Sequence, residues 1–489
     1  MPQTAIIQTA QTTSLQFEQL GDLMSQPNAG LSSQPNPNNS TNPSDAGLNI
    51  NELMRLASFA TDLLEGRPIG HGMRVAVIAG RTAQQLGLPV REVTSITYAG
   101  LLHDVGLASV ATGVYGELRT YNNALSEKQV LYHHTLLNGR VMQLPDAVQL
   151  PPSAEDILKA HTHHAGQFIG AWALSQDVQE IILAHHELCD GSGYPYGLSR
   201  EAIPLGARIL AFADTIEAVI AEAPTGLATR WSGVENFIEV KVAHTFDPEV
   251  VSAFKVLAFQ EHEMDSTDFL PGLLSRDVLM NSLTTLLPQR TSIAPAQQVL
   301  PVLQAIGRLS DQLMPGCTDH QSLQVARISL VLADRLGIQS AQRGELVTAA
   351  MLLSLGKLSL PLSILWHPGA LTAPEWQQVQ AYPRESARLL STVPSFSQLS
   401  QWTGDHQERL NGTGYPNHRK GFDISIASRI LGLSNAFVGL TSPRPFRSHF
   451  YDPLDALPIL GQGRHRLFDD HLVSLLRTVV LEQPIAGPV

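Results

Sequence analysis

Two histidine-containing pairs could carry chemistry, because each ends an apolar run and precedes a glycine-containing loop. Residues 101–106 read LLHDVG, and residues 181–187 read IILAHHE. Imidazole and carboxylate groups together form a ligand set for Fe, Mn or Zn with open coordination positions. The sequence therefore predicts a metal centre that includes His103, Asp104, His185 and His186.

The second pair leads into residues 190–195, which read DGSGYP. The combination of an HD pair, an HH pair and this loop resembles the HD-GYP family, a branch of the HD phosphohydrolases. The resemblance implies His103 and Asp104 as catalytic residues. It also implies metal ligands at a histidine before the HD pair, the HD pair itself, a mid-motif histidine, the HH pair and a later aspartate, which are His71, His103, Asp104, His161, His185, His186 and Asp214.

The second half of the chain is an internal repeat of the first. Val325-Ala326 matches Val75-Ala76 at an offset of 250 (325 − 75), and Leu336-Gly337 matches Leu86-Gly87 at the same offset. The segments 412–416 and 429–431 match 191–195 and 208–210 at an offset of 221 (412 − 191). The offset falls because the first copy has an insertion between residues 107 and 161.

The second copy keeps this frame but has lost ligand-type residues. Only His185 keeps an imidazole, at His406. The other replacements are His71 by Gln321, His103 by Leu353, Asp104 by Ser354, His161 by Tyr382, His186 by Gln407 and Asp214 by Asn435. The first copy is therefore predicted to bind metal and the second to be degenerate.

Two of the expected ligands have alternatives. His161 is favoured as the mid-motif ligand because Tyr382-Pro383 stands at its repeat position, followed by His164 and then His134. Asp214 is expected to bind metal, the alternative being a cap or a pair with Arg208.

Two positions depart from the family pattern. Leu107 stands where the family usually has a lysine that contacts substrate phosphate, whereas the second copy has Lys357. Arg67 stands where some members have a glutamate that supports a third metal. We therefore expect two divalent ions, Fe or Mn with Zn or Ni as alternatives, and weakened phosphate binding.

The loop after the HH pair is expected to be a structural element beside the substrate. Its members are Asp190, Gly191, Gly193, Tyr194 and Pro195, and its glycines permit a tight turn. Glu187 is expected to orient a ligand imidazole, or else to be a solvated acid at a helix end.

Composition limits the class of protein. A net charge of −12 argues against a broad DNA, RNA or anionic-membrane footprint, and two cysteines fit a reducing cytoplasm. No run reaches about 18 apolar residues, so we expect no membrane span. Cytoplasmic localisation is the expectation.

Helical periodicity and few alternating runs predict an all-α protein. The resemblance, together with the internal repeat, implies tandem HD-domain helical bundles, the second a degenerate repeat of the first. The expected parts are a disordered polar tail at 1–47, a metal-binding HD-GYP domain at 48–262, a linker at 263–297 and a degenerate HD-GYP-like domain at 298–489.

The resemblance implies a bacterial second-messenger enzyme that hydrolyses cyclic di-GMP to pGpG or GMP. One alternative is a signalling or scaffold protein that binds metal or nucleotide with little turnover. Another is an HD hydrolase of a different phosphorylated substrate. The GYP loop and the degenerate domain are candidate surfaces for protein partners, and the degenerate domain for homodimerisation.

Overall fold

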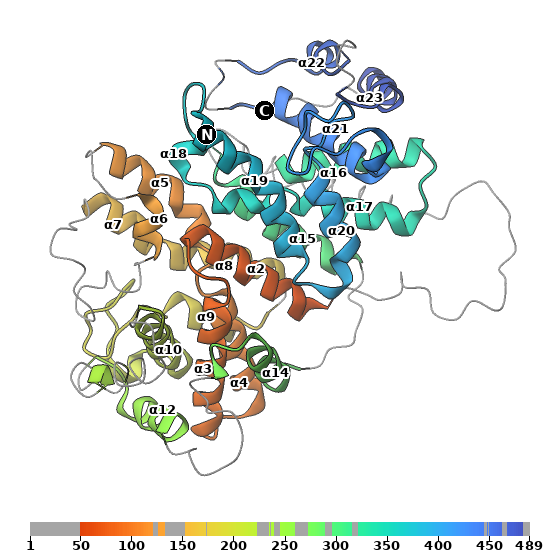
Figure 1. The fold of residues 1–489 in the computed structure, drawn as a ribbon. Coiled ribbons are helices and arrows are strands. Elements are labelled where there is room, and N and C mark those ends of the chain that lie inside the picture. Colours follow the sequence, from red (N-terminus) through yellow and green to blue (C-terminus); the bar gives the residue numbers. More distant parts are fainter. Residues whose placement is uncertain are drawn as a thin grey trace, which may run out of the picture. The chain divides into compact units, whose positions relative to one another are not determined.

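The computed structural model describes residues 49–120, 126–132, 152–172, 174–222, 234, 236–238, 245–259, 272–288, 296–314, 321–444, 447, 449–461 and 467–482. These residues form helices and connecting loops (Figure 1), which confirms the all-α prediction. Among them, no helix combines the length and the apolarity needed to span a bilayer. The predicted tail at 1–47 lies outside the described residues.

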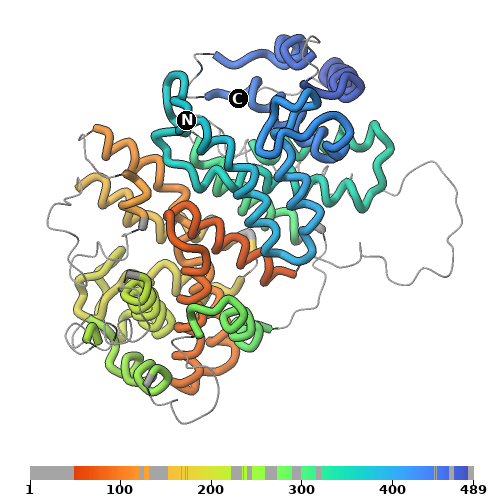
Figure 2. The backbone as a smooth tube through the Cα atoms, in the orientation of Figure 1, coloured from red at the N-terminus to blue at the C-terminus, as the bar shows by residue number. Residues whose placement is uncertain are grey.

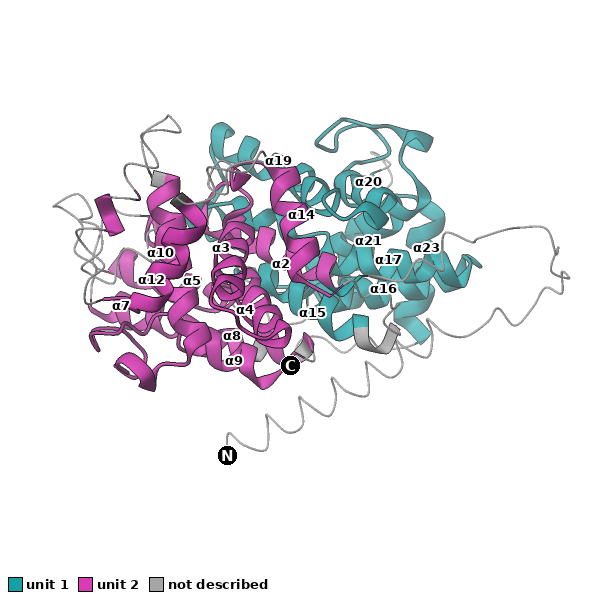
Figure 3. Cartoon of the chain, turned by 90° about the horizontal axis from the view of Figure 1, so that it is seen from below, with its two compact units in different colours: residues 1–50, 292–489 teal, residues 51–291 magenta. Residues whose placement is uncertain are grey.

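The described chain forms two compact units (Figure 3), called here the N-terminal unit, residues 51–291, and the C-terminal unit, residues 292–489 with residues 49–50. Figure 2 follows the chain from the red helices of the first to the blue helices of the second. The stretch 263–297, expected to be a linker, contains the helix α14 (Arg276–Leu286), which packs against α3 (His71–Gln85) and α4 (Val90–Leu102) in the N-terminal unit.

The N-terminal unit is built around α3, which packs against α4, α10, α12 and α14, while α9 packs against α4, α8 and α10. Its helices are α2 (Ile50–Glu65), α3 (His71–Gln85), α4 (Val90–Leu102), α5 (Leu107–Thr120), α6 (Glu127–Tyr132), α7 (Pro152–Lys159), α8 (His161–Ile169), α9 (Gln176–Leu183), α10 (Leu205–Glu222), α12 (Pro248–Phe259) and α14 (Arg276–Leu286).

The C-terminal unit repeats this plan, with α16 packed against α15, α17, α21 and α23. Its helices are α15 (Ala296–Asp311), α16 (Gln321–Arg335), α17 (Ser340–Leu352), α18 (Leu362–Leu365), α19 (Ala373–Leu390), α20 (Ser397–Asp405), α21 (Ile426–Thr441), α22 (Pro453–Leu460) and α23 (Asp470–Glu482). The starts of α16 and α17 lie 250 residues after those of α3 and α4, and α20 and α21 start 221 residues after α9 and α10. The predicted tandem repeat is therefore confirmed at the level of whole helices.

One glycine in each unit, before the point where the repeat offset changes from 250 to 221, contacts the backbone of a residue that lies after that point. A Cβ on Gly106 would lie 2.0 Å from the carbonyl oxygen of His161, and a Cβ on Gly356 would lie 2.0 Å from that of Tyr382. Only glycine permits such an approach between the end of one helix and the backbone of another. His161 and Tyr382 therefore occupy equivalent places.

Candidate metal centre

The carboxylate of Asp104 lies between two groups of imidazoles in the N-terminal unit. Its Oδ2 is 2.9 Å from Nε2 of His103 and 3.8 Å from Nε2 of His71. Its Oδ1 is 3.7 Å from Nε2 of His161 and 3.9 Å from Nε2 of His185. Because each oxygen faces a different group, Asp104 has the position of a bridging ligand.

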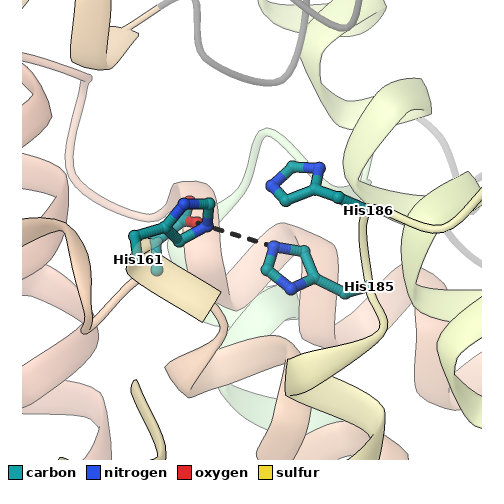
Figure 4. Close-up of side chains that lie close together, drawn as sticks. His161, His185 and His186 are labelled. Atoms are coloured by element: carbon teal, nitrogen blue, oxygen red, sulfur yellow. Dashed lines mark ion pairs between the residues drawn. The ribbon is translucent and has the colours of Figure 1, made fainter. Parts of the chain in front are cut away.

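Asp214 and His186 complete the two groups. Oδ1 of Asp214 lies 3.6 Å from Nε2 of His71 and 3.7 Å from Nε2 of His103. A ligand atom of His186 lies within 4.8 Å of ligand atoms of Asp104, His161 and His185. Figure 4 shows the ring of His161 facing the adjacent rings of His185 and His186, which come from another segment of the chain. We call the group of His71, His103 and Asp214 the Asp214 half, and that of His161, His185 and His186 the His186 half.

Helix ends place most of these side chains. His71 and His161 open α3 and α8, His103 directly follows α4, and the pair 185–186 follows α9. On α2, the buried carboxylate of Asp62 accepts hydrogen bonds from the backbone N–H groups of Gly70 (2.6 Å) and Gly72 (3.3 Å), which fixes the start of α3. The apolar runs seen in the sequence pack the helices, and their polar ends meet.

Backbone carbonyls orient three of the imidazoles. Nδ1 of His103 donates to the Gly100 carbonyl (2.9 Å), and Nδ1 of His161 donates to the Leu158 carbonyl (2.8 Å). His185 makes the same contact with the carbonyl oxygen of residue 182 (2.6 Å). A carbonyl can only accept, so Nδ1 carries the proton and the Nε2 lone pair faces the cluster, as metal ligation requires.

Sequence reasoning missed Glu217, which holds His71. The carboxylate of Glu217 is buried and accepts a hydrogen bond from Nδ1 of His71, a second from Nε of Arg74 (2.6 Å), and lies 3.7 Å from Nη1 of Arg67. The internal repeat contained the signal, because the position 221 residues later is Val438.

The two halves differ in their electrostatics. Burial opposes protonation of His71, but the charges of Glu217 and the hydrogen bond to Asp104 raise its pKa to about 9. Burial likewise opposes protonation of His103, whose pKa is nevertheless raised, chiefly by Asp104. At His185 burial prevails and lowers the pKa to about 4. Negative charge is therefore concentrated in the Asp214 half.

The cluster suits divalent cations. Its seven side chains are all buried, and Nε2 of His185 makes no hydrogen bond with any described residue. A buried imidazole nitrogen without a partner is costly unless a ligand occupies its lone pair. Six of these side chains form two groups whose ligand atoms lie within 4.8 Å of one another, and both groups include Asp104. The residues present therefore fit divalent metal.

The alternative ligands lie elsewhere. His164 is half-buried on α8 and is outside both groups, and His134 is outside the described residues. Arg208, the alternative partner of Asp214, pairs with Asp247.

The GYP loop braces the cluster from one side. The ring of Tyr194 stacks on that of His186, with centroids 4.7 Å apart and planes 23° apart. A Cβ on Gly193 would lie 2.4 Å from the His186 carbonyl oxygen, so the loop needs glycine to come this close. Oδ1 of Asp190 accepts hydrogen bonds from the N–H (2.9 Å) and hydroxyl (2.5 Å) of Ser192, and the peptide before Pro195 is cis.

Glu187 has a different role from either one expected. It is buried, and its two carboxylate oxygens accept hydrogen bonds from the backbone N–H groups of Tyr196 (2.7 Å) and Leu198 (2.8 Å). It therefore anchors the GYP loop. Sequence spacing could not show this, because the partners are backbone groups nine and eleven residues away.

The two departures from the family pattern are both buried. Leu107 opens α5 within the core and offers no charge. The guanidinium of Arg67 contacts Glu65 through Nε (2.6 Å), and its pKa is raised by the carboxylates of Glu65 and Glu217 against the effect of burial.

The chain is similar to known HD-domain proteins. A family model described as an HD domain matches residues 142–250 and 301–472, more than half of the chain. The 3'3'-cGAMP-specific phosphodiesterase 3 of Vibrio cholerae serotype O1 is 28% identical over 458 residues, which cover 88% of this chain and 94% of the relative. A cyclic di-GMP phosphodiesterase of Thermotoga maritima is 29% identical over 203 residues, or 42% and 48% of the two chains.

The fold also matches a solved structure. The crystal structure of a cyclic GMP-AMP-specific phosphodiesterase of V. cholerae superposes with a TM-score of 0.61 at 23% identity, covering 90% of this chain and 99% of that one. At this level of identity the match concerns the fold alone.

Proposed function

The chain belongs to the HD-GYP branch of the HD-domain family, and from this premise we propose that its N-terminal unit hydrolyses cyclic dinucleotides at a two-metal centre. The observation that carries the proposal is the position of Asp104, whose two oxygens face two separate groups of imidazoles. Two metals about 3.5–4 Å apart form the usual clamp for in-line phosphodiester hydrolysis.

Two cations rather than three fit the charges of the site. The position where a third ion would need an acidic ligand holds Arg67, which lies 3.7 Å from Glu217. A guanidinium retains its charge at any physiological pH and repels a neighbouring cation. This supports a centre limited to the Asp214 and His186 halves, with Fe or Mn as the proposed metals and Zn or Ni as alternatives.

Divalent ions bound here supply Lewis acidity and lower the pKa of a bound water from ~16 towards ~7. The protein fixes where this happens. Asp104 sets the separation of the two positions, carbonyl contacts keep the His103, His161 and His185 lone pairs aimed inward, and Glu217 holds His71. Burial of the ligands strengthens each electrostatic interaction.

Lys159 is a candidate for the phosphate contact that Leu107 cannot make. Its Nζ lies 5.8 Å from the centroid of the Tyr194 ring, which in turn stacks on His186. Its side chain is 38% exposed and pairs with the exposed carboxylate of Glu155 at 2.7 Å. An ion pair in contact with solvent contributes little free energy, so a phosphate can compete with Glu155 for this ammonium group. A phosphodiester beside the His186 half would meet this ammonium group.

Two substrates follow from the relatives. Cyclic di-GMP, hydrolysed to pGpG or GMP, is the substrate implied by the sequence resemblance and by the name of the Thermotoga relative. The Vibrio relative that matches over 94% of its length is named for 3'3'-cGAMP, which makes this the second candidate.

The test is turnover of both cyclic dinucleotides by purified protein loaded anaerobically with Fe(II) or Mn(II), with metal content measured on the same samples. A His103→Ala, Asp104→Ala double variant is the control. We expect turnover that depends on metal and is lost in the variant. Metal binding without turnover of either nucleotide would instead favour the signalling or scaffold role.

A further inference from the structure

The C-terminal unit contains a cavity of about 770 Å³ that the proposed reaction does not use. Three residues of its wall, Tyr382, Gln407 and Asn435, stand at the positions of the metal ligands His161, His186 and Asp214 in the repeat. The degenerate copy has therefore kept a cavity where the N-terminal unit has its cluster. A volume of this size is typical of sites for small organic ligands.

Neutral hydrogen bonds replace the metal ligands beside this cavity. The hydroxyl of Tyr382 lies 2.8 Å from Nε2 of His406 and accepts a hydrogen bond from the side-chain amide of Gln407 at 2.7 Å. Nδ1 of His406 contacts the carbonyl oxygen of Thr403 at 2.5 Å. The imidazole thus has protein partners on both nitrogens, which leaves no ligand position for a metal.

The charge of the wall is one-sided. Among the described residues that line it, four are cationic, Lys357, Arg409, Arg444 and Arg447, and none is acidic. The chain as a whole carries a net charge of −12, so this concentration of positive charge is local. It indicates an anionic ligand.

Backbone and amide oxygens hold two of these cations in place. Arg447 donates to the carbonyls of Leu440 (3.0 Å) and Gly439 (3.2 Å) at the end of α21. Arg409 donates to the Glu408 carbonyl (2.8 Å) and to the side-chain oxygen of Gln407 (2.8 Å). These acceptors orient a guanidinium without cancelling its charge, so its field reaches the cavity.

The remainder of the wall suits a planar, weakly polar group. Trp376, Tyr382 and Phe468 line it together with aliphatic side chains. Trp376 is 45% exposed and so can still gain contact area from a ligand. Stacking on aromatic rings combined with cationic groups is how proteins bind nucleobases and their phosphates without metal.

We propose that the C-terminal unit binds a nucleotide in this cavity without hydrolysing it, with phosphate near Lys357 and Arg444 and a base against Trp376. The proposal concerns a second site and does not depend on turnover in the N-terminal unit. Its ligand is a cyclic dinucleotide, the linear dinucleotide product or a mononucleotide, which share this chemistry.

Calorimetric titration of the full chain tests the proposal. Cyclic di-GMP, pGpG and GMP are titrated separately into the His103→Ala, Asp104→Ala variant, and into the unmodified chain in excess chelator so that the result does not depend on how the variant folds. At least one nucleotide should saturate both samples at one site per chain. If none of the three does, the proposal is wrong, whatever the turnover of the wild type.

Two further substitutions locate the site. Lys357→Ala should weaken binding roughly ten-fold or more, since a hydrogen bond to a charged group is lost, and Lys357→Arg should restore it. Trp376→Ala should weaken it roughly five-fold or more. The matched control is Arg384→Ala, which removes an exposed cation of α19 outside the cavity wall. Binding that is weakened by the control as much as by Lys357→Ala would overturn the assignment, as would unchanged binding in both cavity variants.

Discussion

The two units share the geometry of the loop that contains the GYP residues, and they differ in the side chains that lie beside this loop. Glu187 and Glu408 each accept two backbone hydrogen bonds from the loop that follows. Both loops have a cis peptide before the proline, and each unit has an Arg–Asp pair, Arg208 with Asp247 and Arg429 with Asp469. The features that the two loops share therefore come from contacts of Glu187 and Glu408 with the loop backbone and from the Arg–Asp pairs, and not from the metal-ligand side chains.

The metal-ligand positions and the residues that support them differ together. With the ligands, the degenerate copy has also lost the residues that support them, since Glu217 becomes Val438 and Arg74 becomes Gln324. Its remaining imidazole, His406, has acquired Tyr382 and Gln407 as neighbours. A buried polar group needs partners, so the loss of a metal position requires replacement of the whole set rather than of one residue.

Substitution of Asp104 should have the largest effect on the difference between the two units. Asp104→Ser introduces the residue of the degenerate copy and should abolish binding at both metal positions. Turnover should fall about a thousand-fold or more, because metal ions supply several kcal/mol of transition-state stabilisation. Metal analysis and turnover are the measurements, with Ser354→Ala as the matched control that should leave metal content unchanged. Retention of metal in Asp104→Ser would contradict the bridging role.

His406 gives the C-terminal unit a stability that depends on pH. Burial lowers the pKa of His406 to about 3. Between about pH 6.5 and pH 3 the unfolded state binds a proton that the folded state does not, so stability falls as the pH falls, by up to about 4 kcal/mol. His406→Gln should flatten the dependence of the unfolding midpoint on pH between 7 and 4. An unaltered dependence would show that other groups cause it.

Glu217 supports the metal ligand His71 in the N-terminal unit and has no counterpart in the C-terminal unit, where Val438 takes its place. Glu217→Gln keeps the volume but removes the charge that holds His71 and Arg74. Metal affinity, measured by competition with a chelator, should fall about 10- to 100-fold. Glu249→Gln, an exposed change on α12, should have no effect. Equal affinities in the two variants would reduce Glu217 to a packing residue.

Because a glutamate anchors the loop in both units, equivalent substitutions of the two glutamates should lower the free energy of unfolding by similar amounts. A glutamine at position 187 or 408 can accept one of the two loop hydrogen bonds, but its NH₂ group opposes the other N–H. Glu187→Gln and Glu408→Gln should each destabilise their own unit by about 1–3 kcal/mol. Thermal unfolding of the two variants measures this, and a large cost in only one unit would show that the loops are not equivalent.

The smallest effect is expected at Lys159. Lys159→Ala removes an ammonium group beside Tyr194 and should raise the KM for the cyclic dinucleotide about two- to ten-fold with metal content unchanged. Lys255→Ala removes an exposed lysine of α12 and serves as the control. The same KM in both variants would leave the phosphate contact to other residues.

Much of the site could be read from the sequence because its residues are adjacent or at matching repeat positions. The pairs at 103–104 and 185–186 and the substitutions in the second copy are visible without coordinates, and the seven predicted side chains lie together. Glu217 could have been found from its replacement by Val438. The role of Glu187 could not, since a buried carboxylate that binds loop amides has the same spacing as one that orients an imidazole.

The sequence by itself determined that the chain is a helical repeat, which copy carries ligand-type residues, and which residues these are. All three depend only on periodicity and on residue type at fixed offsets. Only the tertiary structure decided that Asp104 faces two groups, that His161 rather than His164 joins one of them, and that cations gather around a cavity in the degenerate unit. Helical periodicity defines which face of a helix is apolar, whereas contacts such as that between His71 and Glu217, 146 residues apart, exist only once those faces have packed.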